Sequence, residues 1–307
     1  MTTNIFVTWG LGAMLAVSTL LNIRACDNHP YPSGLPKVEA ATQEKGSRRE
    51  EPRVQESDDN EERTRSSQEK REGLADDYDL AMPAPRQDIA EQILRRTAYA
   101  TSFNSTTNMP NWVAWCLTRE HTHGSVQRSE ARFHEDDDVD PRNRVTTYDY
   151  MRSGYDRGHM CPAGDNKWSY EAMTECFLMT NICPQVHSLN AGDWNEIEIK
   201  CRSWANRYGR IYIVSGPILF RSQHKRIGQQ HKVTVPEAFF KVVLRMDDGD
   251  AQAIGFIYRN QAGNRPMGDY VNSVDEVERI TGYDFFPQLP DELEEKVEAS
   301  ASLKEWR

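Results

Sequence analysis

The chain has 307 residues, of which 47 are acidic and 37 basic, and its formal net charge is -10. Hydrophobic residues make up 38% of the sequence and the mean hydropathy is -0.75, which argues against a chain that is globular from end to end. The charge likewise argues against a protein that binds nucleic acid through an overall basic surface.

The first 26 residues are predicted to be a signal peptide or a membrane anchor. No charged side chain precedes Arg24, and residues 5–23 are mostly apolar, which is long enough for a bilayer span and also fits a secretory signal. Cys26 would suit a lipid anchor, although Ile23 and Arg24 make a poor attachment motif. We therefore expect an exported domain, either secreted, periplasmic or membrane-anchored, that lies outside the cytoplasm.

Residues 27–84 are predicted to be a disordered, charged linker. About half of the residues from 37 to 80 are charged, and Tyr78 is the one aromatic residue among them. Glu and Arg at helical spacing would suit a solvated helix, but such a helix would have no apolar face to bury. The folded domain is therefore expected to span residues 85–307.

The remainder of the sequence predicts a single α+β domain. Strands are predicted at 111–117, 176–182, 210–216, 237–246 and 252–260. A hairpin turn is expected at 247–250. Helices are expected at 193–208 and 274–281, the second with a capping box of Ser273 and Glu276. Because strands far outnumber βαβ units, we expect a mixed, largely antiparallel sheet with helices packed on it.

The cysteines favour buried thiols over a metal site. They are Cys26, Cys116, Cys161, Cys176, Cys183 and Cys201. Five fall in the folded region, so at least one of these is unpaired, and spacing does not reveal any pairing. A zinc site built from His159 and three of these thiols would match no common zinc spacing. Buried thiols, with one pair bridged at most, are the favoured interpretation.

The helix at 193–208 predicts an amide and a carboxylate on its protein-facing side. Its apolar stripe consists of Trp194, Ile197, Cys201, Trp204, Ala205 and Tyr208. If the helix reaches back to Asn190, this residue projects onto the stripe, and Glu198 lies on its flank. A helix-capping Asn and a salt-bridged Glu are the structural alternative. Eight residues span about 12 Å of helix, so Asn190 as a direct Mg²⁺ ligand and Glu198 as a ligand through water fit that distance.

The segment GYDRGHMCP, residues 154–162, combines a base with a phosphate-binding group. A neutral His159 can take a proton from water as the water attacks phosphorus. Arg157 would point to the same face of an extended segment and present its fork to phosphate oxygens. Gly158 allows close approach of backbone or substrate, and Asp156 is expected to orient the loop rather than to react. These groups predict the hydrolysis of a phosphodiester.

Three segments follow one another in a specific order: DRGHMCP at 156–162, MTNICPQ at 179–185 and LNAGDWNEIE at 189–198. Together they resemble the signature of the DNA/RNA non-specific endonucleases, the ββα-metal family that includes secreted bacterial nucleases and mitochondrial endonuclease G. The resemblance extends over residues 111–290 and implies the ββα-metal nuclease fold.

The resemblance implies a role for each matching residue. The general base of the family falls on His159, its metal-binding Asn on Asn190 and its outer-shell Glu on Glu198. The arginine of the DRGH motif is Arg157, and Asn181 matches an asparagine that supports the site. The family also places an upstream arginine on the substrate phosphate. Two candidates exist for that role, and we prefer Arg128 to Arg132.

The resemblance also implies a reaction and its partners. It predicts cleavage of DNA and RNA to 5′-phosphate products with little base preference, with Mg²⁺ as the cofactor and Mn²⁺ as its substitute. Two further contacts are considered separately: attachment to a membrane through the N-terminal segment, and assembly of two copies of the chain into a homodimer. Two other interpretations stay open: an exported, non-catalytic module of the same fold that binds nucleic acid or a surface partner, and a zinc-stabilised structural domain.

Because the acidic balance is unusual for a nucleic-acid binder, a local basic groove is expected. Its first wall would consist of Arg128, Arg132, Arg142, Arg144, Arg152 and Arg157. A second wall would come from residues 221–226 and 231–232. The alternative for these residues is a set of solvated loops.

Overall fold

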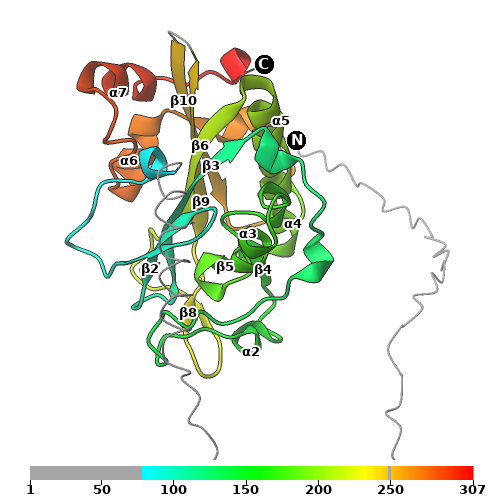
Figure 1. The fold of residues 1–307 in the computed structure, drawn as a ribbon. Helices are drawn as coiled ribbons and strands as arrows, with labels where there is room; N and C mark the ends of the chain where they lie inside the picture. Colours follow the sequence, from blue (N-terminus) through cyan, green and yellow to red (C-terminus); the bar gives the residue numbers. More distant parts are fainter. Residues whose placement is uncertain (1–77, 248–249, 307) are drawn as a thin grey trace, which may run out of the picture. The chain divides into compact units, whose positions relative to one another are not determined.

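A seven-stranded sheet crosses the centre of the computed structural model, which describes residues 78–247 and 250–306 (Figure 1). Its strand order is β1-β2-β3-β6-β9-β10-β11, and all neighbours are antiparallel. The strands are β1 Gln92–Arg95, β2 Ala100–Asn104, β3 Met109–Thr118, β6 Arg210–Ile218, β9 Ala238–Asp247, β10 Asp250–Arg259 and β11 Val271–Asn272. Two antiparallel pairs stand apart: β4 Asp156–His159 with β5 Ile182–Gln185, and β7 Arg226–Ile227 with β8 Val233–Thr234.

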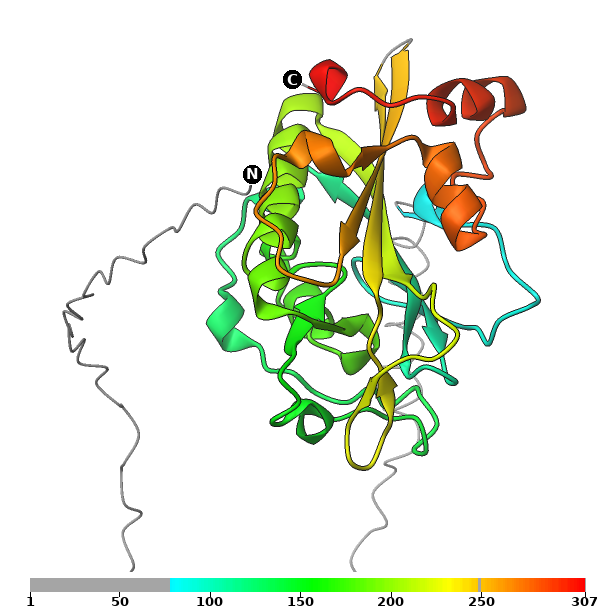
Figure 2. The same cartoon turned by 180° about the vertical axis from the view of Figure 1, so that it is seen from behind.

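Helices cover both faces of the sheet (Figures 1 and 2). They are α2 Thr147–Tyr150, α3 Tyr170–Glu175, α4 His187–Asn190, α5 Asp193–Tyr208, α6 Val274–Thr281 and α7 Asp291–Glu298. One face carries α3, α4, α5 and the β4–β5 pair, and the other carries α6 and α7. The antiparallel sheet with helices on it confirms the predicted α+β class.

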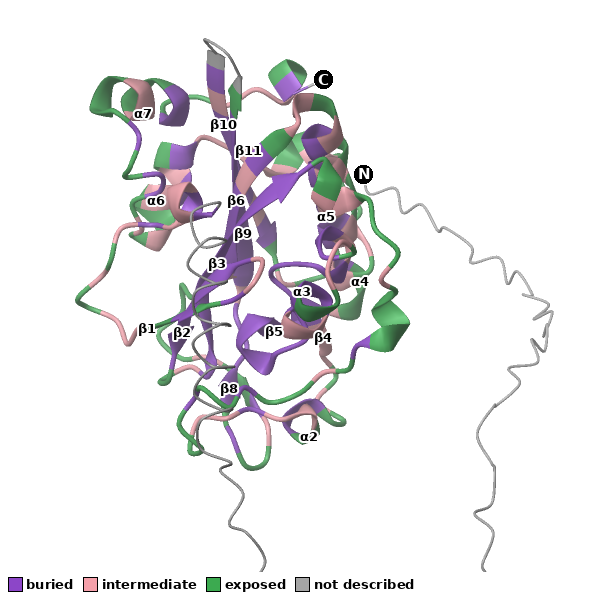
Figure 3. Ribbon diagram, viewed as in Figure 1, coloured by how far each residue is buried: buried purple, intermediate pink, exposed green. Residues whose placement is uncertain are grey.

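Alternation along β3 explains why both faces are covered. Val113 and Leu117 point into the core layer under α5, whereas Ala114 and Cys116 point into the layer under α6 and α7. Every residue of β3 is buried (Figure 3). Residues 112–117 of the strand therefore form a continuous apolar run rather than an alternation of apolar and polar residues.

Most of the predicted elements are confirmed. Four of the five predicted strands and both predicted helices are present, with bounds that differ by two residues or fewer. Helix α6 begins at Val274 as expected, and the Ser273 hydroxyl oxygen accepts a hydrogen bond from the Glu276 N–H at 3.1 Å. The capping box is only half formed, because the Glu276 carboxylate accepts hydrogen bonds from Arg279. It ends at Gly282, whose φ of +73° suits a glycine at a helix C-terminus.

The strand predicted at 176–182 is wrong. Residues 179–181 form a 3₁₀ turn, and strand pairing starts only at Ile182 in β5. Cys176 and Phe177 are buried in the core because they lie between α3 and this turn, not because they belong to a strand. A short apolar run does not separate a strand from a buried turn.

The folded domain begins before residue 85, the boundary expected from composition. Tyr78 is 3% exposed, its hydroxyl donates a hydrogen bond to the Arg96 carbonyl at 3.1 Å, and Ala81 is fully buried in the α6–α7 layer. Most of the predicted leader and linker, up to residue 77, lies outside the described residues. Within residues 78–247 and 250–306, no helix has the length and apolar character that a membrane span requires.

We expect a deletion of residues 1–77 to leave a domain with the melting temperature of the full chain. A deletion of residues 1–84 should lower that temperature by about 6 °C or more, since losing a buried aromatic costs ~3–5 kcal/mol and each kcal/mol moves Tm by about 2–4 °C in a domain of this size. Thermal unfolding of the two truncations checks this. Equal melting temperatures would show that the Tyr78 contact contributes nothing.

Candidate active site

The β4–β5 pair and helices α4 and α5 form a ββα unit on one face of the sheet. His159 is the last residue of β4 and pairs with Ile182 of β5, while its carbonyl accepts a hydrogen bond from the Trp194 indole at 3.2 Å. A cleft of about 460 Å³ lies over this unit. Its lining includes five of the predicted site residues: Arg128, Arg157, His159, Asn190 and Glu198. The structure thus brings together residues that lie far apart in the sequence.

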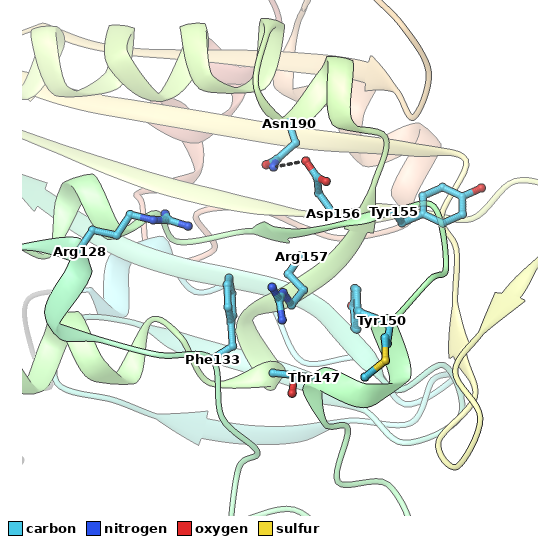
Figure 4. A pocket seen from close by; sticks show the side chains of 9 residues that line it. Arg128, Phe133, Thr147, Tyr150, Tyr155, Asp156, Arg157 and Asn190 are labelled. Carbon is cyan, nitrogen blue, oxygen red and sulfur yellow. Dashed lines mark hydrogen bonds between the residues drawn. The ribbon is translucent and has the colours of Figure 1, made fainter. Parts of the chain in front are cut away.

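A second hollow of about 470 Å³ adjoins the cleft (Figure 4). Arg128, Arg157 and Asn190 line both hollows, so the two form one groove. The second hollow adds Asp156 and the aromatic Tyr155. A groove with cations along it and an aromatic ring at one end suits a nucleic-acid strand.

The imidazole of His159 is held in its neutral form. It is 6% exposed and lies against the rings of Phe133 and Phe177, with centroid distances of 5.2 and 4.9 Å. Burial, followed by the charges of Arg128 and Arg157, lowers the pKa of His159 to about 3. Its buried Nε2 has no hydrogen-bond partner among the described residues. A neutral imidazole that lines the cleft is suited to accept a proton.

Asn181 fixes the backbone that follows His159. Its Oδ1 accepts a hydrogen bond from the Cys161 N–H at 2.9 Å, and its Nδ2 donates to the carbonyls of Cys161 and Cys176 at 2.9 and 2.7 Å. The side chain is fully buried. This geometry gives Asn181 a supporting position, because it contacts the main chain of the β4 end and not the cleft.

Asp156 sets the orientation of Asn190. The Asn190 Nδ2 donates a hydrogen bond to Asp156 Oδ2 at 3.0 Å (Figure 4), and His187 Nδ1 lies 2.8 Å from the same oxygen. Because the amide nitrogen is turned toward Asp156, Oδ1 of Asn190 points away from that carboxylate. An amide oxygen is a suitable ligand for a hard cation.

The helix that was expected to carry both Asn190 and Glu198 is interrupted. Helix α4 ends at Asn190, α5 begins at Asp193, and Gly192 between them has φ -103° and ψ -113°. A Cβ at Gly192 would lie 2.4 Å from the Ser188 carbonyl oxygen. The spacing derived from a continuous helix is therefore wrong, although both side chains reach the same cleft.

Glu198 lies half-buried on the cleft-facing side of α5. Burial raises the pKa of Glu198 to about 7, while the nearby Lys241 and Arg202 act in the opposite direction. Lys241 is buried between the rings of Trp115 and Trp194, at 4.8 and 4.5 Å from their centroids. The carboxylate therefore has a pKa near neutrality and would gain a counter-charge from a bound cation.

The basic groove is smaller than predicted. Arg128 and Arg157 line the cleft, with their guanidinium groups over Phe177 at 5.1 Å and Phe133 at 4.4 Å. Arg132 lies outside both hollows, and its Nη1 donates a hydrogen bond to its neighbouring carbonyl of residue 131 at 2.9 Å.

Other arginines of the expected wall are neutralised elsewhere. Arg142 pairs with Asp140 at 2.8 Å and Arg144 with Asp137 at 2.8 Å. His231 is 5% exposed and contacts a buried carboxylate, and neither hollow is lined by residues 231–232. The acidic run at 134–140 thus binds the arginines that follow it.

Sequence reasoning missed several groups at the cleft. No sequence pattern predicts that Phe133, Phe177 and His187 lie near the site. Their position depends on contacts between segments that are distant in the sequence. Lys167 and Arg202 also line the cleft. Arg202 could have been found, since it follows Glu198 by one helical turn and lies on the same side of α5.

The zinc interpretation is not supported. Cys161, Cys176, Cys183 and Cys201 are buried and form no disulfide within the described residues. Burial raises the pKa of the thiols of Cys161, Cys176 and Cys183, so none is prepared to act as a thiolate ligand. Within the described ranges, the single group of three or more metal-ligating side chains lies on α6 and α7, away from His159.

A ββα unit that presents a histidine, an asparagine and arginines to one cleft defines a ββα-metal nuclease fold. The family model of the DNA/RNA non-specific endonucleases matches residues 79–292. The crystal structure of an EndoG/EndoGI complex superposes with a TM-score of 0.66 at 27% identity, covering 71% of this chain and 92% of that one. The chain belongs to the DNA/RNA non-specific endonuclease family.

Individual relatives agree with this assignment. The mitochondrial nuclease EXOG of Xenopus laevis is 36% identical over 204 residues, which cover 62% of this chain and 57% of that protein. Mitochondrial endonuclease G of Bos taurus is 32% identical over 210 residues, covering 64% and 70%. The mitochondrial nuclease of Saccharomyces cerevisiae is 29% identical over 233 residues, covering 69% and 70%. The chain therefore spans less than two thirds of the EXOG relative.

These relatives contradict the prediction of an exported domain. Those of Xenopus, Bos and Saccharomyces are all mitochondrial nucleases, not secreted or periplasmic proteins. The prediction rested on the apolar character of residues 5–23, and hydrophobicity alone does not specify the compartment to which a leader directs a chain. The signal peptide is therefore withdrawn together with the exported location.

Proposed function

We propose that this protein is a divalent-metal-dependent endonuclease that hydrolyses phosphodiester bonds of DNA and RNA and leaves 5′-phosphate ends. One observation carries the proposal: His159, whose lowered pKa keeps its imidazole neutral, lines the cleft that Arg157 and Asn190 also line. Membership of the endonuclease family supports the same reaction.

The residues present fit a hard cation such as Mg²⁺, with Mn²⁺ as a substitute. Asn190, with its amide oxygen turned away from Asp156, would hold the ion directly, and Glu198 would hold it through water. When bound, the ion would offset the negative charge that develops on the leaving oxygen. Family membership supports a divalent metal, and the oxygen donors favour Mg²⁺ over softer ions.

The protein groups supply the remaining parts of the reaction. His159 accepts a proton from a water molecule in the cleft, and the resulting hydroxide attacks phosphorus as the bond to the 3′-oxygen breaks. Arg157 and Arg128, which line both hollows, bind the non-bridging phosphate oxygens. The phosphate stays on the 5′ side, and the 3′-oxygen leaves as a hydroxyl after protonation by solvent. We assign Arg128, rather than Arg132, to the upstream phosphate contact.

The direct test incubates the full chain with supercoiled plasmid and with RNA, with Mg²⁺ or with EDTA. We expect nicking and RNA degradation in Mg²⁺ and neither in EDTA, and end-labelling should show 5′-phosphates. Nucleic-acid binding without cleavage at any metal concentration would instead identify a non-catalytic module of the same fold. A homodimer stays a prediction that sedimentation of the same preparation can check.

The metal affinity should depend on pH through Glu198. Because the pKa of Glu198 is raised to about 7, the carboxylate form is dominant above pH 7 and is lost as the pH falls. The apparent Mg²⁺ affinity should therefore fall about tenfold for each pH unit below 7. Plasmid nicking as a function of Mg²⁺ concentration at pH 8, 7 and 6 measures it.

The matched variant is Glu198→Gln, which keeps the volume of the side chain and removes its charge. It should weaken apparent Mg²⁺ affinity at pH 8 by ~10–100-fold, and its affinity should no longer change with pH. Substrate binding should change much less. An equal loss of rate at limiting and at saturating Mg²⁺ would assign Glu198 to another task.

A further inference from the structure

Three carboxylates converge on the face of the sheet opposite the cleft. Asp275 and Glu278 come from α6, and Glu298 is the last residue of α7. A carboxylate oxygen of each lies within 4.8 Å of those of the other two. The two helices lie side by side across the sheet from α5 (Figures 1 and 2). Proximity of acids alone is common at protein surfaces, so the burial of the group is what matters.

Glu298 is buried, and one of its carboxylate oxygens has no partner within the described residues. It is 5% exposed, and its Oε1 is shielded from solvent and has no hydrogen bond within the described ranges. In the same part of the chain, no ion pair includes Asp275, Glu278 or Glu298. The nearest base on α6, Arg279, is engaged with Glu276 at 2.7 Å. A buried carboxylate without a cation is costly.

The surroundings of Glu298 add further negative charge. Glu294 and Asp284 also lie close enough to act on it electrostatically. Glu298 ends α7, where the helix dipole disfavours an anion. Burial, followed by the charge of Glu278, raises the pKa of Glu298 to about 9, and burial raises that of Glu278 to about 7. The cluster therefore requires either protons or a cation to offset its charge.

We propose that Asp275, Glu278 and Glu298 bind one divalent cation of the Ca²⁺ type, which fastens α7 to α6. Ca²⁺ accepts six to eight oxygen ligands in flexible geometry, and carboxylates supply one or two each. Asp275 is exposed, so water can complete the coordination from that side. Glu298 lies beyond residue 292, where the match to the family model ends. One of the three proposed ligands therefore lies outside the family match, and the site is separate from the catalytic cleft.

Thermal unfolding of the full chain without nucleic acid tests this site. At pH 7.5, Ca²⁺ at about 100 times its Kd should raise the melting temperature by about 5–10 °C relative to EDTA. Glu298→Gln should abolish this shift. Asp275→Asn changes an exposed position and should reduce Ca²⁺ affinity without loss of folding. Glu295→Gln removes the same charge from an exposed position of α7 and should keep the full shift.

One further variant separates this site from the nuclease cleft. Glu198→Gln should retain the Ca²⁺ shift, because its carboxylate lies across the sheet from α6 and α7. The proposal is overturned if the wild type shows no Ca²⁺ shift, or if Glu298→Gln keeps it. It is equally overturned if acidification from pH 8 to 6 stabilises the wild type while Ca²⁺ has no effect, since the cluster would then hold protons alone.

Discussion

Replacement of His159 by alanine should reduce plasmid cleavage by about 10²–10⁴-fold, the usual cost of losing a general base. The reduction should appear at saturating Mg²⁺, because His159 is not a proposed metal ligand, and nucleic-acid binding should be nearly unchanged. Its pKa of about 3 keeps the free imidazole neutral across pH 5–8. Loss of activity between pH 8 and 6 should therefore follow the protonation of Glu198 and not that of His159.

The burial of His159 requires a second variant. It is 6% exposed between two aromatic rings, so alanine leaves a cavity and lowers stability to some extent. His159→Gln keeps most of the volume and offers no comparable base, so it should lose activity with a smaller change in melting temperature. Nicking rate, melting temperature and bound metal should be measured on the same preparation. Nicking at the wild-type rate by either variant would exclude His159 as the base.

The sequence predicted which residues share the cleft better than it predicted the walls around it. His159 and Arg157 lie two residues apart in a strand, and local periodicity is sufficient to place them on one cleft. Glu198 follows from helical periodicity in the same way. Phe133, by contrast, lies in a loop without a regular period. No sequence pattern predicts its contact with His159. Local patterns predict elements, whereas contacts between distant loops depend on the whole fold.

The predicted start of the folded domain and the predicted basic wall were wrong for a related reason. Averaged composition placed Tyr78 in the linker, although a single buried aromatic and its hydrogen bond attach this segment to the domain. Arg142 and Arg144 were counted toward a basic wall because composition does not show that nearby aspartates pair with them. Charge counts predict the balance of a segment, but side-chain pairing decides which charges face a ligand.

Replacement of Asn190 by alanine should act through the metal instead of the proton. It should lower the nicking rate at limiting Mg²⁺ by ~100-fold or more, since even residues that contact a metal indirectly typically contribute 10–100-fold. High Mg²⁺ or Mn²⁺ should restore part of the rate, which neither His159 variant should show. Titration of the nicking rate with each metal provides the measurement, and a loss that no metal concentration relieves would exclude Asn190 as a ligand.

The hydrogen bond from Asn190 to Asp156 allows a second test of Asn190 as a metal ligand. If Asp156 acts by holding the amide with its oxygen toward the metal, Asp156→Ala should weaken metal affinity less than Asn190→Ala does. The double variant should then be no worse than Asn190→Ala alone, because the second change removes support for a ligand already lost. Additive losses in the double variant would show that Asp156 binds the metal itself or acts on the substrate independently of Asn190.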